Sequence, residues 1–439
     1  MQYIRTFGFY AGLWALVLML EFAALWGSAW IPNDLLDAQI QQSADTLCQK
    51  PVFDTVLSAD PSSMLDHYAD SILLNIAYHM GSNPSLSTVM SAAYYHTDIQ
   101  NENENLQDAV YASLPANQSY SRYWHGTICL LRPLLMIMPI LGIYLCNAVL
   151  LAVLTLLLLF LLRRMFSNGA AICFFVSFCL TGCWFTPFSI EYFTPVIIML
   201  IFSILVLILF RNGHFRAVFA MFLIAGSITA YMDFLTTETM TLLVPLILTL
   251  LWRKQHMDST SGSHIVHCLK CTMLWGIGYA ATWIGKWVLA SAVLHTNVLK
   301  EAVSQAEYRI AGTGAEISGF TQCLHAIFRN LGSLFPFSLM GQYSYVYAFF
   351  ALLIAVLVYE FIKKRKGLAA ISTALTLLCF VPYIRYVVLA NHSYIHYFFT
   401  YRAQLASCMC LALLFLYNTD TVFLRKQLHR SAKPHRKHK

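Results

Sequence analysis

Two carboxylates one helical turn apart are the first residues in this chain whose spacing suggests acid–base chemistry. Asp66 and Asp70 flank the run His67-Tyr68-Ala69, and a helical spacing of four residues would put both on one face. Because like charges at that distance repel, one of the two is expected to have a raised pKa, as a general base requires. An acidic, solvated helix face with an N-cap is the alternative interpretation.

A second cluster combines arginine and histidine with aromatic side chains. It runs from Tyr120 to Gly126 and is followed by an arginine. Aromatic residues are usual at a membrane interface, but guanidinium groups are not, and they match phosphate bidentately. An anchored interfacial helix is the alternative. The substrate-binding candidates of this cluster are Arg122, Trp124, His125 and Arg132.

A third cluster, residues 391–402, is rich in histidine, tyrosine and arginine and contains no acid. His392 and His396 are one helical turn apart and could bind a divalent metal, but without a nearby carboxylate we favour phosphate binding there and at Arg402. Asp233 ends another apolar run at the same face, where an acid is costly unless solvated or paired. An aromatic belt with isolated polar groups is the alternative.

These clusters must be positioned by a membrane protein. The chain has 439 residues, of which 58% are hydrophobic and 11% charged, and its mean hydropathy is +0.61. A soluble protein would carry about 25% charged residues, so lipid must be the solvent for much of this surface. The formal charge of +7 is therefore a topology signal, and we expect no nucleic-acid partner.

Ten apolar runs are candidate transmembrane helices. The basic clusters between them all fall on one side if both termini are cytoplasmic. The sequence thus predicts an all-α integral membrane protein with about ten transmembrane helices, both termini inside, in the bacterial cytoplasmic membrane. The runs lie at residues 8–31, 139–162, 169–187, 195–210, 217–232, 240–252, 271–293, 343–362, 368–388 and 403–418.

One long acidic insert after the first run, from Pro32 to His125, is expected to organise the outer face. We expect it to form half of a site at the water–lipid boundary, with Asp233 and residues 391–402 forming the other half. The expected divisions are a signal-anchor helix (1–31), an extracytoplasmic loop with interfacial helices (32–138), transmembrane helices 2–7 (139–293), a second extracytoplasmic loop (294–342), helices 8–10 (343–418) and a basic cytoplasmic tail (419–439).

Two ionisable residues fall inside the apolar runs. Such residues are usually functional or paired. Glu21 is expected either to act in function or to have a helix-packing partner. Lys286 is expected either to snorkel to the interface or to pair with an acid at the outer boundary.

Several other kinds of site are not supported. Cys268 and Cys271 have metal-like spacing but no second pair, and no Walker loop or hydrolase elbow occurs. The short motif Gly276-Ile-Gly278 lacks the rest of a dinucleotide fingerprint. Cys48 and Cys323 fall in the two outer loops, which leaves a disulfide open. No cofactor is assigned, and a divalent metal remains open.

The topology resembles that of the GT-C glycosyltransferase superfamily over nearly the whole chain. The resemblance rests on an N-in first span, a large outer first loop with interfacial helices and acids, and re-entry through an arginine-rich interface. The family's acid pair just past the first span would correspond to Asp34 and Asp37, here separated by two leucines. The catalytic acid therefore stays open between Asp34, Asp37, Asp66 and Asp70.

The resemblance implies an enzyme that transfers a sugar from a polyprenyl-phosphate carrier to an envelope glycan, lipid or protein. Asp70 is the first choice for the general base. Arg122, Arg132 and Arg402 would hold the carrier phosphate. The chain is also similar to a group of Firmicutes membrane proteins with segments like Tyr-x-Arg-Tyr-Trp-His-Gly and Asp-Phe-Leu-Thr, which brings no established activity.

Two other classes of function remain open. A transporter or flippase for a lipid-linked saccharide would place polar residues near the membrane midplane. A non-catalytic envelope assembly factor would use the insert to bind a partner. An enzyme would bring four side chains together in one cavity: Asp70, Arg122, His125 and Arg402. If these side chains point apart, a binding role is favoured.

Overall fold

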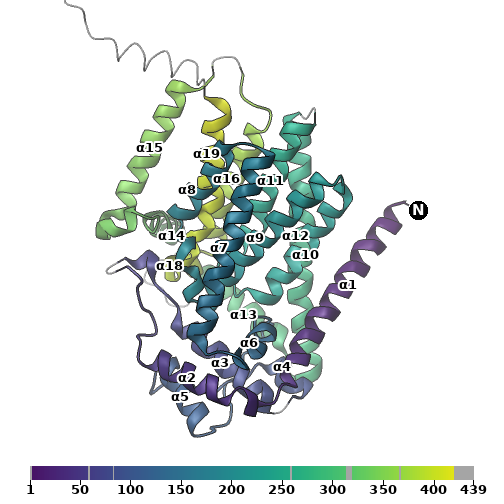
Figure 1. Cartoon of the computed structure of the whole chain (residues 1–439), viewed down its shortest axis with the longest axis vertical. Coiled ribbons are helices and arrows are strands. Elements are labelled where there is room, and N and C mark those ends of the chain that lie inside the picture. Colours follow the sequence, from purple (N-terminus) through teal and green to yellow (C-terminus); the bar gives the residue numbers. More distant parts are fainter. Residues whose placement is uncertain are drawn as a thin grey trace, which may run out of the picture.

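The computed structural model shows a bundle of long helices with a lobe of short helices at one end (Figure 1). It describes residues 2–57, 60–82, 84–257, 260–312, 319–364 and 367–419, so the basic tail predicted at 419–439 lies almost wholly outside them. Every regular element in these ranges is a helix. The predicted all-α class is therefore confirmed.

Seven described helices are long and apolar enough to cross a membrane, which indicates a membrane-embedded protein. All ten predicted runs coincide with helices, but the number that span and their orientation stay predictions. The long candidates are α1 (Gln2–Ala29), α7 (Ile140–Met165), α9 (Ile190–Arg211), α10 (Phe215–Met232), α12 (Ser261–Leu294), η4 with α15 (Phe337–Tyr343, Ser344–Ile362), and α18, η5 and α19 together (Tyr397–Thr400, Tyr401–Gln404, Leu405–Asn418). The remaining three runs correspond to α8 (Asn168–Leu180), α11 (Thr239–His256) and α16 (Ser372–Val388). The run of α8 also includes the short helix η3 (Cys183–Phe188).

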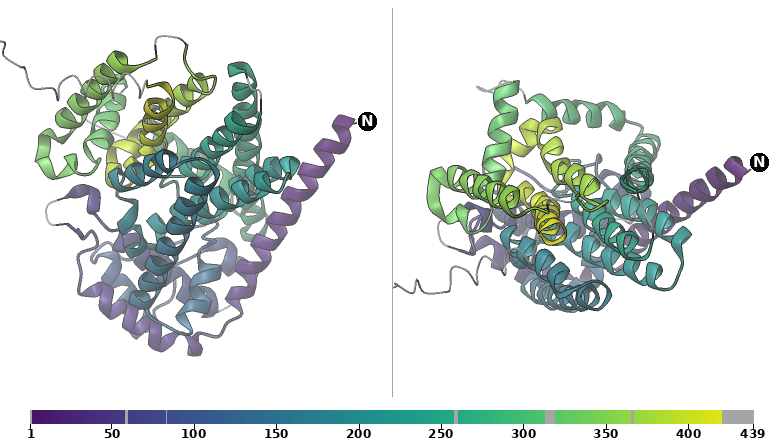
Figure 2. Two further views of the ribbon diagram at one scale, coloured as in Figure 1. Left: turned by 45° about the horizontal axis from the view of Figure 1, so that its top comes forward. Right: turned by 90° about the horizontal axis from the view of Figure 1, so that it is seen from above.

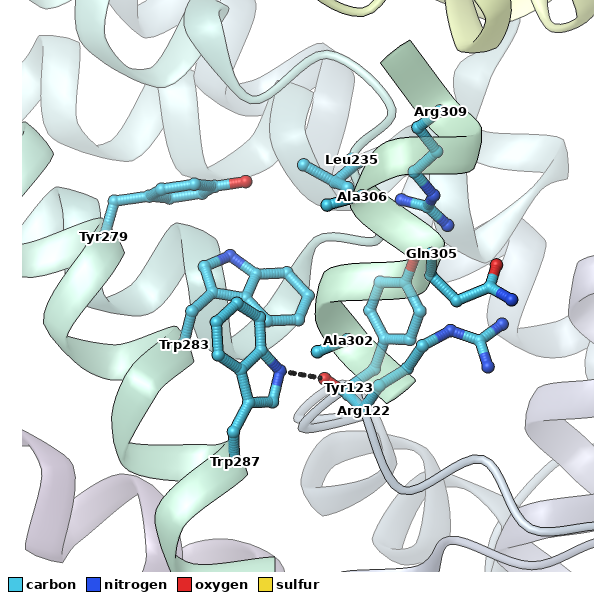
Figure 3. A pocket seen from close by; sticks show the side chains of 10 residues that line it. All are labelled: Arg122, Tyr123, Leu235, Tyr279, Trp283, Trp287, Ala302, Gln305, Ala306 and Arg309. Carbon is cyan, nitrogen blue, oxygen red and sulfur yellow. Dashed lines mark hydrogen bonds between the residues drawn. The ribbon is translucent and has the colours of Figure 1, made fainter. Parts of the chain in front are cut away.

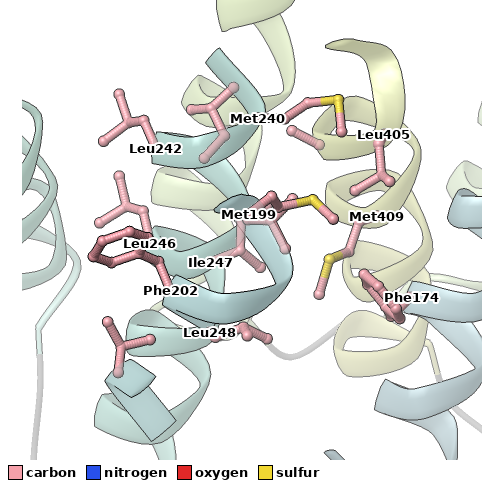
Figure 4. Close-up of a cluster of buried hydrophobic side chains, with 14 of the residues drawn as sticks. Phe174, Met199, Phe202, Met240, Leu242, Leu246, Ile247, Leu248, Leu405 and Met409 are labelled. Carbon is pink, nitrogen blue, oxygen red and sulfur yellow. The ribbon is translucent and has the colours of Figure 1, made fainter. Parts of the chain in front are cut away.

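The bundle is built around α11, in which every residue from Met240 to Trp252 is buried. A helix that is apolar on all sides belongs inside a bundle. Helices α9 and α19 pack against it, and Figure 4 shows Met199 of α9 and Met409 of α19 beside Ile247. In contrast, α1 diverges from the bundle toward its N-terminus (Figure 2).

Two glycines let α10 and α12 approach closely. A Cβ atom on Gly226 would collide with the carbonyl of Trp275, and one on Gly278 would collide with the carbonyl of Leu223. Gly276, two residues away on α12, meets nothing within 4 Å. The Gly276-Ile-Gly278 motif therefore serves helix packing through only one of its glycines.

The two charges predicted inside the membrane both have packing partners. Ser227 of α10 donates to Glu21 of α1 at 3.1 Å, so the helix-packing alternative holds for Glu21. Lys286 is fully buried and donates to the carbonyl of Met90 at 2.9 Å. It thus neither snorkels nor pairs with an acid of the described residues, because a helix C-terminus offers the cation a carbonyl instead.

The predicted insert forms the lobe. Its hydrophobic core includes Leu47, Leu74 and Leu106, so it folds as a packed unit rather than an open loop. The segment predicted as the second extracytoplasmic loop packs beside it, since Glu301 contacts Arg122 and Ser338 contacts Ser62. The lobe contains η1 (Asn33–Leu35), α2 (Asp37–Cys48), η2 (Pro61–Ser63), α3 (His67–Ser82), α4 (Leu86–Ser91), α5 (Glu102–Tyr111) and α6 (Ile128–Leu135), and the second loop and its neighbour contribute α13 (Val298–Ala311), α14 (Phe320–Gly332) and α17 (Ala390–Ile395).

Candidate functional site

A cavity of about 360 Å³, here called the outer chamber, lies between the lobe and the adjoining ends of the bundle helices. Segments far apart in sequence line it, from α3 and the loop before α6 to the start of α9, α13, α17 and α18. The wall is partly aromatic. Its polar side chains are Asp66, Tyr68, Tyr120, Tyr123, His125, Glu191, Arg309, His392 and His396.

Asp66 is the acid that the lobe contributes to the chamber. It precedes the first turn of α3, so its carboxylate accepts the N–H of Ala69 at 2.9 Å, as an N-cap does. The hydroxyl of Tyr192 donates to its other oxygen at 3.3 Å. Burial raises the pKa of Asp66 to about 6, although both hydrogen bonds favour the charged form. A carboxylate that faces a cavity with such a pKa suits a general base.

Glu191 brings a second carboxylate to the same chamber. It lies in the first turn of α9 and is buried. Two acids lining one cavity repel each other, which favours a state with a single negative charge. In the sequence Glu191 lies between the predicted runs 169–187 and 195–210, and neither run indicates that it faces Asp66.

Asp70, the first choice for the base, lies outside the chamber. The hydroxyl of Tyr144 donates to one of its oxygens at 2.5 Å, and the N–H of Ile190 donates to the other at 2.9 Å. Its side chain is fully buried, and burial raises the pKa of Asp70 to about 8. A buried carboxyl group with both oxygens occupied by hydrogen bonds fits a cap for α9 better than a base that an acceptor hydroxyl must reach.

The histidines of the chamber are neutral. His125 bonds the carbonyl of Tyr120 through Nε2 at 3.1 Å, so Nε2 donates and Nδ1 is left as a buried acceptor without a partner in the described residues. Burial, with a smaller effect of Lys286, lowers the pKa of His125 to about 3. Burial likewise lowers the pKa of His396 to about 4, and it holds the pKa of His392 well below its usual value. Neutral imidazoles suit hydroxyl groups better than they suit phosphate.

Arg309 is the one arginine or lysine among the described residues that line the chamber. Its guanidinium lies over the ring of Tyr123, 5.4 Å from the centroid. Arg309 was not predicted from sequence, because residues 294–342 contain no obvious cluster of site residues. Its helical spacing from Val298 and Ala302, both buried, was the available signal for an inward face.

A second cavity of about 190 Å³, here called the aromatic groove, shares Tyr123 and Arg309 with the chamber (Figure 3). One side of it is the outer end of α12, where Tyr279, Trp283 and Trp287 follow one another along the helix. Figure 3 shows these rings facing α13 across the groove. The groove is therefore mainly apolar, with guanidinium groups at one edge.

Arg122 lines the groove rather than the chamber. Its Nη1 donates to the carboxylate of Glu301 at 3.0 Å, and its guanidinium lies 4.5 Å from the ring centroid of Tyr120. Its backbone carbonyl accepts the indole N–H of Trp287 at 3.0 Å. Arg122 is thus already paired, whereas no carboxylate of the described residues pairs with Arg309.

Two predicted arginines hold the scaffold together instead of facing a cavity. Arg132 is fully buried, and its guanidinium donates to the carbonyls of Ser28, Ile31 and Ala77. It therefore ties α1 to α3. Arg402 is 1% exposed, lies 4.6 Å from the ring centroid of Tyr192 and donates to a carbonyl of η2 at 3.3 Å. Arg402 thus backs the tyrosine that binds Asp66.

The other predicted residues also lie outside the chamber. Trp124 is fully buried and donates to the carbonyl of Thr282 at 2.9 Å. Asp233 is bound by Thr236, and burial raises the pKa of Asp233 to about 7. Asp34 is exposed, Asp37 is half-buried, and neither lines the chamber.

The predicted convergence of four residues on one cavity is not observed. His125 lines the chamber, Arg122 lines the groove, and Asp70 and Arg402 are packed behind the chamber wall. What meets there instead is Asp66, Glu191, Arg309, His125, His392 and His396.

No group of three or more histidine, cysteine, aspartate or glutamate side chains in the described ranges is placed to hold a metal ion. The twelve cysteines lie within those ranges and are free thiols, so the disulfide left open between Cys48 and Cys323 is not formed. Comparison of the chain with protein-family models, curated proteins and solved structures gives no match.

Proposed function

We propose that this protein transfers a sugar from a polyprenyl-phosphate carrier to a hydroxyl group of an envelope acceptor at the outer face of the membrane. The observation that carries the proposal is the pair of adjoining cavities that share Arg309. One is polar and contains a carboxylate suited to act as a base. The other is apolar and lies on a helix long enough to cross the membrane.

The aromatic groove suits the part of the carrier nearest its phosphate. Isoprenoid units are apolar and would pack on Trp283 and Trp287. The phosphate would then reach the edge of the groove, where Arg309 is free to bind it. Arg122, held by Glu301, is the second cation within this region. The donor phosphate is therefore assigned to Arg309, and Arg132 and Arg402 are assigned to the scaffold.

The outer chamber suits the sugar and the attacking hydroxyl. Aromatic rings stack on sugar faces, and neutral imidazoles such as His125 exchange hydrogen bonds with hydroxyl groups. Asp66 would take the proton of the acceptor hydroxyl, and that oxygen would attack C1 of the sugar. The bond between C1 and the phosphate oxygen would break, and its electron pair would leave with the phosphate, stabilised by Arg309. The configuration at C1 would invert.

A binding role without chemistry is the second candidate. The observation that favours it is the scaffold position of Asp70 and Arg402, two of the four residues expected to converge. A protein of this kind would bind a lipid-linked saccharide in the same cavities and release it unchanged. A flippase is less favoured, because Glu21, an acid inside a candidate membrane span, is engaged by Ser227 in helix packing.

The base is tested by replacing Asp66 and measuring turnover. Purified protein in proteoliposomes would receive a panel of polyprenyl-phosphate-linked radiolabelled sugars and a membrane acceptor fraction. We expect Asp66→Asn to lower transfer by about 10²- to 10⁴-fold while carrier binding is retained. Asp98→Asn, at a fully exposed acid of the same lobe, is the matched control. Transfer by Asp66→Asn at the wild-type rate would exclude Asp66 as the base. Absence of transfer by the wild type with every sugar of the panel would favour the binding role.

The phosphate site is tested by replacing Arg309. We expect Arg309→Gln to weaken the binding of polyprenyl phosphate by about tenfold or more, because a charged hydrogen bond to phosphate contributes about 1.5–3 kcal/mol. Lys300→Gln removes an exposed cation from the same helix and should leave binding unchanged. Affinity would be measured by competition with a fluorescent carrier analogue. If both variants lose affinity equally, general charge rather than a defined site would explain it.

A further inference from the structure

A cavity of about 380 Å³ lies at the end of the bundle opposite the lobe, and we call it the far-face cavity. Its position follows from α12, which has 34 residues and would be about 50 Å long. Lys286, near the C-terminal end of α12, contacts the lobe through Met90. Ser263 and the rest of the first turn therefore lie at the far end, next to the last turn of α11 (Figure 1).

Two cations line this cavity, and neither has a carboxylate partner in the described ranges. Arg253 belongs to the last turn of α11, and Lys270 belongs to α12. Neither is in an ion pair with any described residue. Asp258, in the loop that joins the two helices, lies outside the described residues. The two positive charges thus converge on one cavity from two different helices.

The guanidinium of Arg253 is incompletely satisfied. Its Nη1 meets the sulfur of Met257 at 3.4 Å, and its Nε is buried without a hydrogen-bond partner among the described residues. A buried N–H without an acceptor costs free energy, and a charged donor costs more. An oxygen anion in the far-face cavity would accept that N–H and relieve the cost. The carbonyl groups at the C-terminus of α11 do not accept it.

The first turn of α12 adds to the positive character of this cavity. Thr260 caps the helix by accepting the N–H of Ser263, and the N–H groups of Ser261 and Gly262 have no acceptor among the described residues. Gly262 carries no side chain and lies on the cavity wall, so an anion could approach the backbone there. Aligned N–H groups at a helix start attract anions.

We infer that the far-face cavity binds a phosphate group, through Arg253, Lys270 and the first turn of α12. An anionic phospholipid headgroup is the source that its position favours. Phe219 and the half-exposed Val266 line the same cavity, so apolar surface that could contact acyl chains adjoins the cations. Free phosphate offers the same oxygen atoms and is distinguished by experiment. The inference does not rest on the proposed function.

The test measures lipid binding by the purified full chain with native mass spectrometry, titrating phosphatidylglycerol or phosphatidylcholine of identical acyl chains. We expect preferential binding of phosphatidylglycerol, weakened about tenfold or more by Arg253→Gln with Lys270→Gln. The single Lys270→Gln variant, at an exposed residue, should fold normally and show part of the loss. The matched control is Arg211→Gln with Arg216→Gln, two exposed cations of the same face that line no described cavity.

Inorganic phosphate supplied as a competitor identifies the source. If phosphate binds the wild type alone and the cavity variants lose it, the site is confirmed with a free ion as its ligand. If phosphatidylglycerol resists phosphate, the lipid is confirmed. Binding of phosphatidylglycerol that is unchanged in the cavity variants, or lowered equally in the control pair, would overturn the inference.

Discussion

Asp66 and Asp70 show how one helical turn separates two kinds of carboxyl group. Asp70 faces α7 and α9, where Tyr144 and the N–H of Ile190 occupy both of its oxygens. Asp66 keeps a wall position in the outer chamber with weaker hydrogen bonds. Only the arrangement at Asp66 leaves a carboxylate that an acceptor hydroxyl can reach.

The proposed role of Asp66 has a pH signature. Burial raises its pKa to about 6, and a general base acts in the ionised form. Transfer should therefore fall about tenfold per pH unit below about pH 6 and level off above it. Burial holds the pKa of His125 at about 3, so His125 is neutral throughout and its replacement by Asn should not move this limb. Initial rates from about pH 5 to about pH 8 would measure the profile, and a flat profile would contradict the assignment.

Sequence could predict the acid pair but not which member faces the cavity. The i, i+4 spacing of Asp66 and Asp70 is local, so helical geometry alone puts them close together. The groups that sort them, Tyr144 and Tyr192, come from helices more than 70 residues away in the chain. Arg309 was missed for a related reason, since its neighbour Tyr123 also comes from a distant segment.

Helix packing in this molecule depends on the contact between α10 and α12. Without a hydrophobic effect between helices in lipid, small residues permit the close approach that gives packing its strength. Gly226 and Gly278 provide that approach on opposite sides of the contact. Because α12 also supplies the wall of the aromatic groove, a shift at this contact would displace Trp283 and Trp287.

Gly278→Ala tests the contact directly. The added methyl would meet the backbone of Leu223, so we expect a loss of about 1–3 kcal/mol in stability and a lower melting temperature in detergent. Gly276→Ala is the control on the same helix, because its added methyl meets open space. It should be neutral or slightly stabilising through higher helix propensity. Equal destabilisation by both variants would contradict this account, because Gly276 has no neighbour in the contact and alanine favours the helix at both positions.

The sequence predicted the positions of the helices better than it predicted the residues of the site. Each of the ten apolar runs is a helix, because a run that long in lipid has to satisfy its own backbone. The run of α11 is among the shorter ones, and the burial of every residue from Met240 to Trp252 explains why all of its faces are apolar there. The contact of Lys286 with Met90 was not predictable, because a short lobe helix supplies the carbonyl.

The whole molecule has two chemically different ends. The lobe end holds the chamber with two carboxylates, and the far end holds a cavity lined by cations. The positive-inside rule assigns the far end to the cytoplasm, and then polyprenyl-linked sugars would be used on the opposite side. The side of the membrane to which each cavity belongs depends on the orientation of the protein. The distribution of basic residues predicts that orientation, whereas helix geometry alone does not.

Orientation is therefore the prediction on which the rest depends. Ile99, 95% exposed on the lobe, and Asn212, in the exposed turn after α9, lie at opposite ends of the molecule. In intact cells a membrane-impermeant maleimide should label Ile99→Cys, whereas Asn212→Cys should be labelled only after permeabilisation. The parent protein with its native cysteines gives the background. The reverse pattern would put the chamber in the cytoplasm, where Asp66 and Arg309 would meet carriers of the inner leaflet, and the proposed outer-face transfer would be wrong.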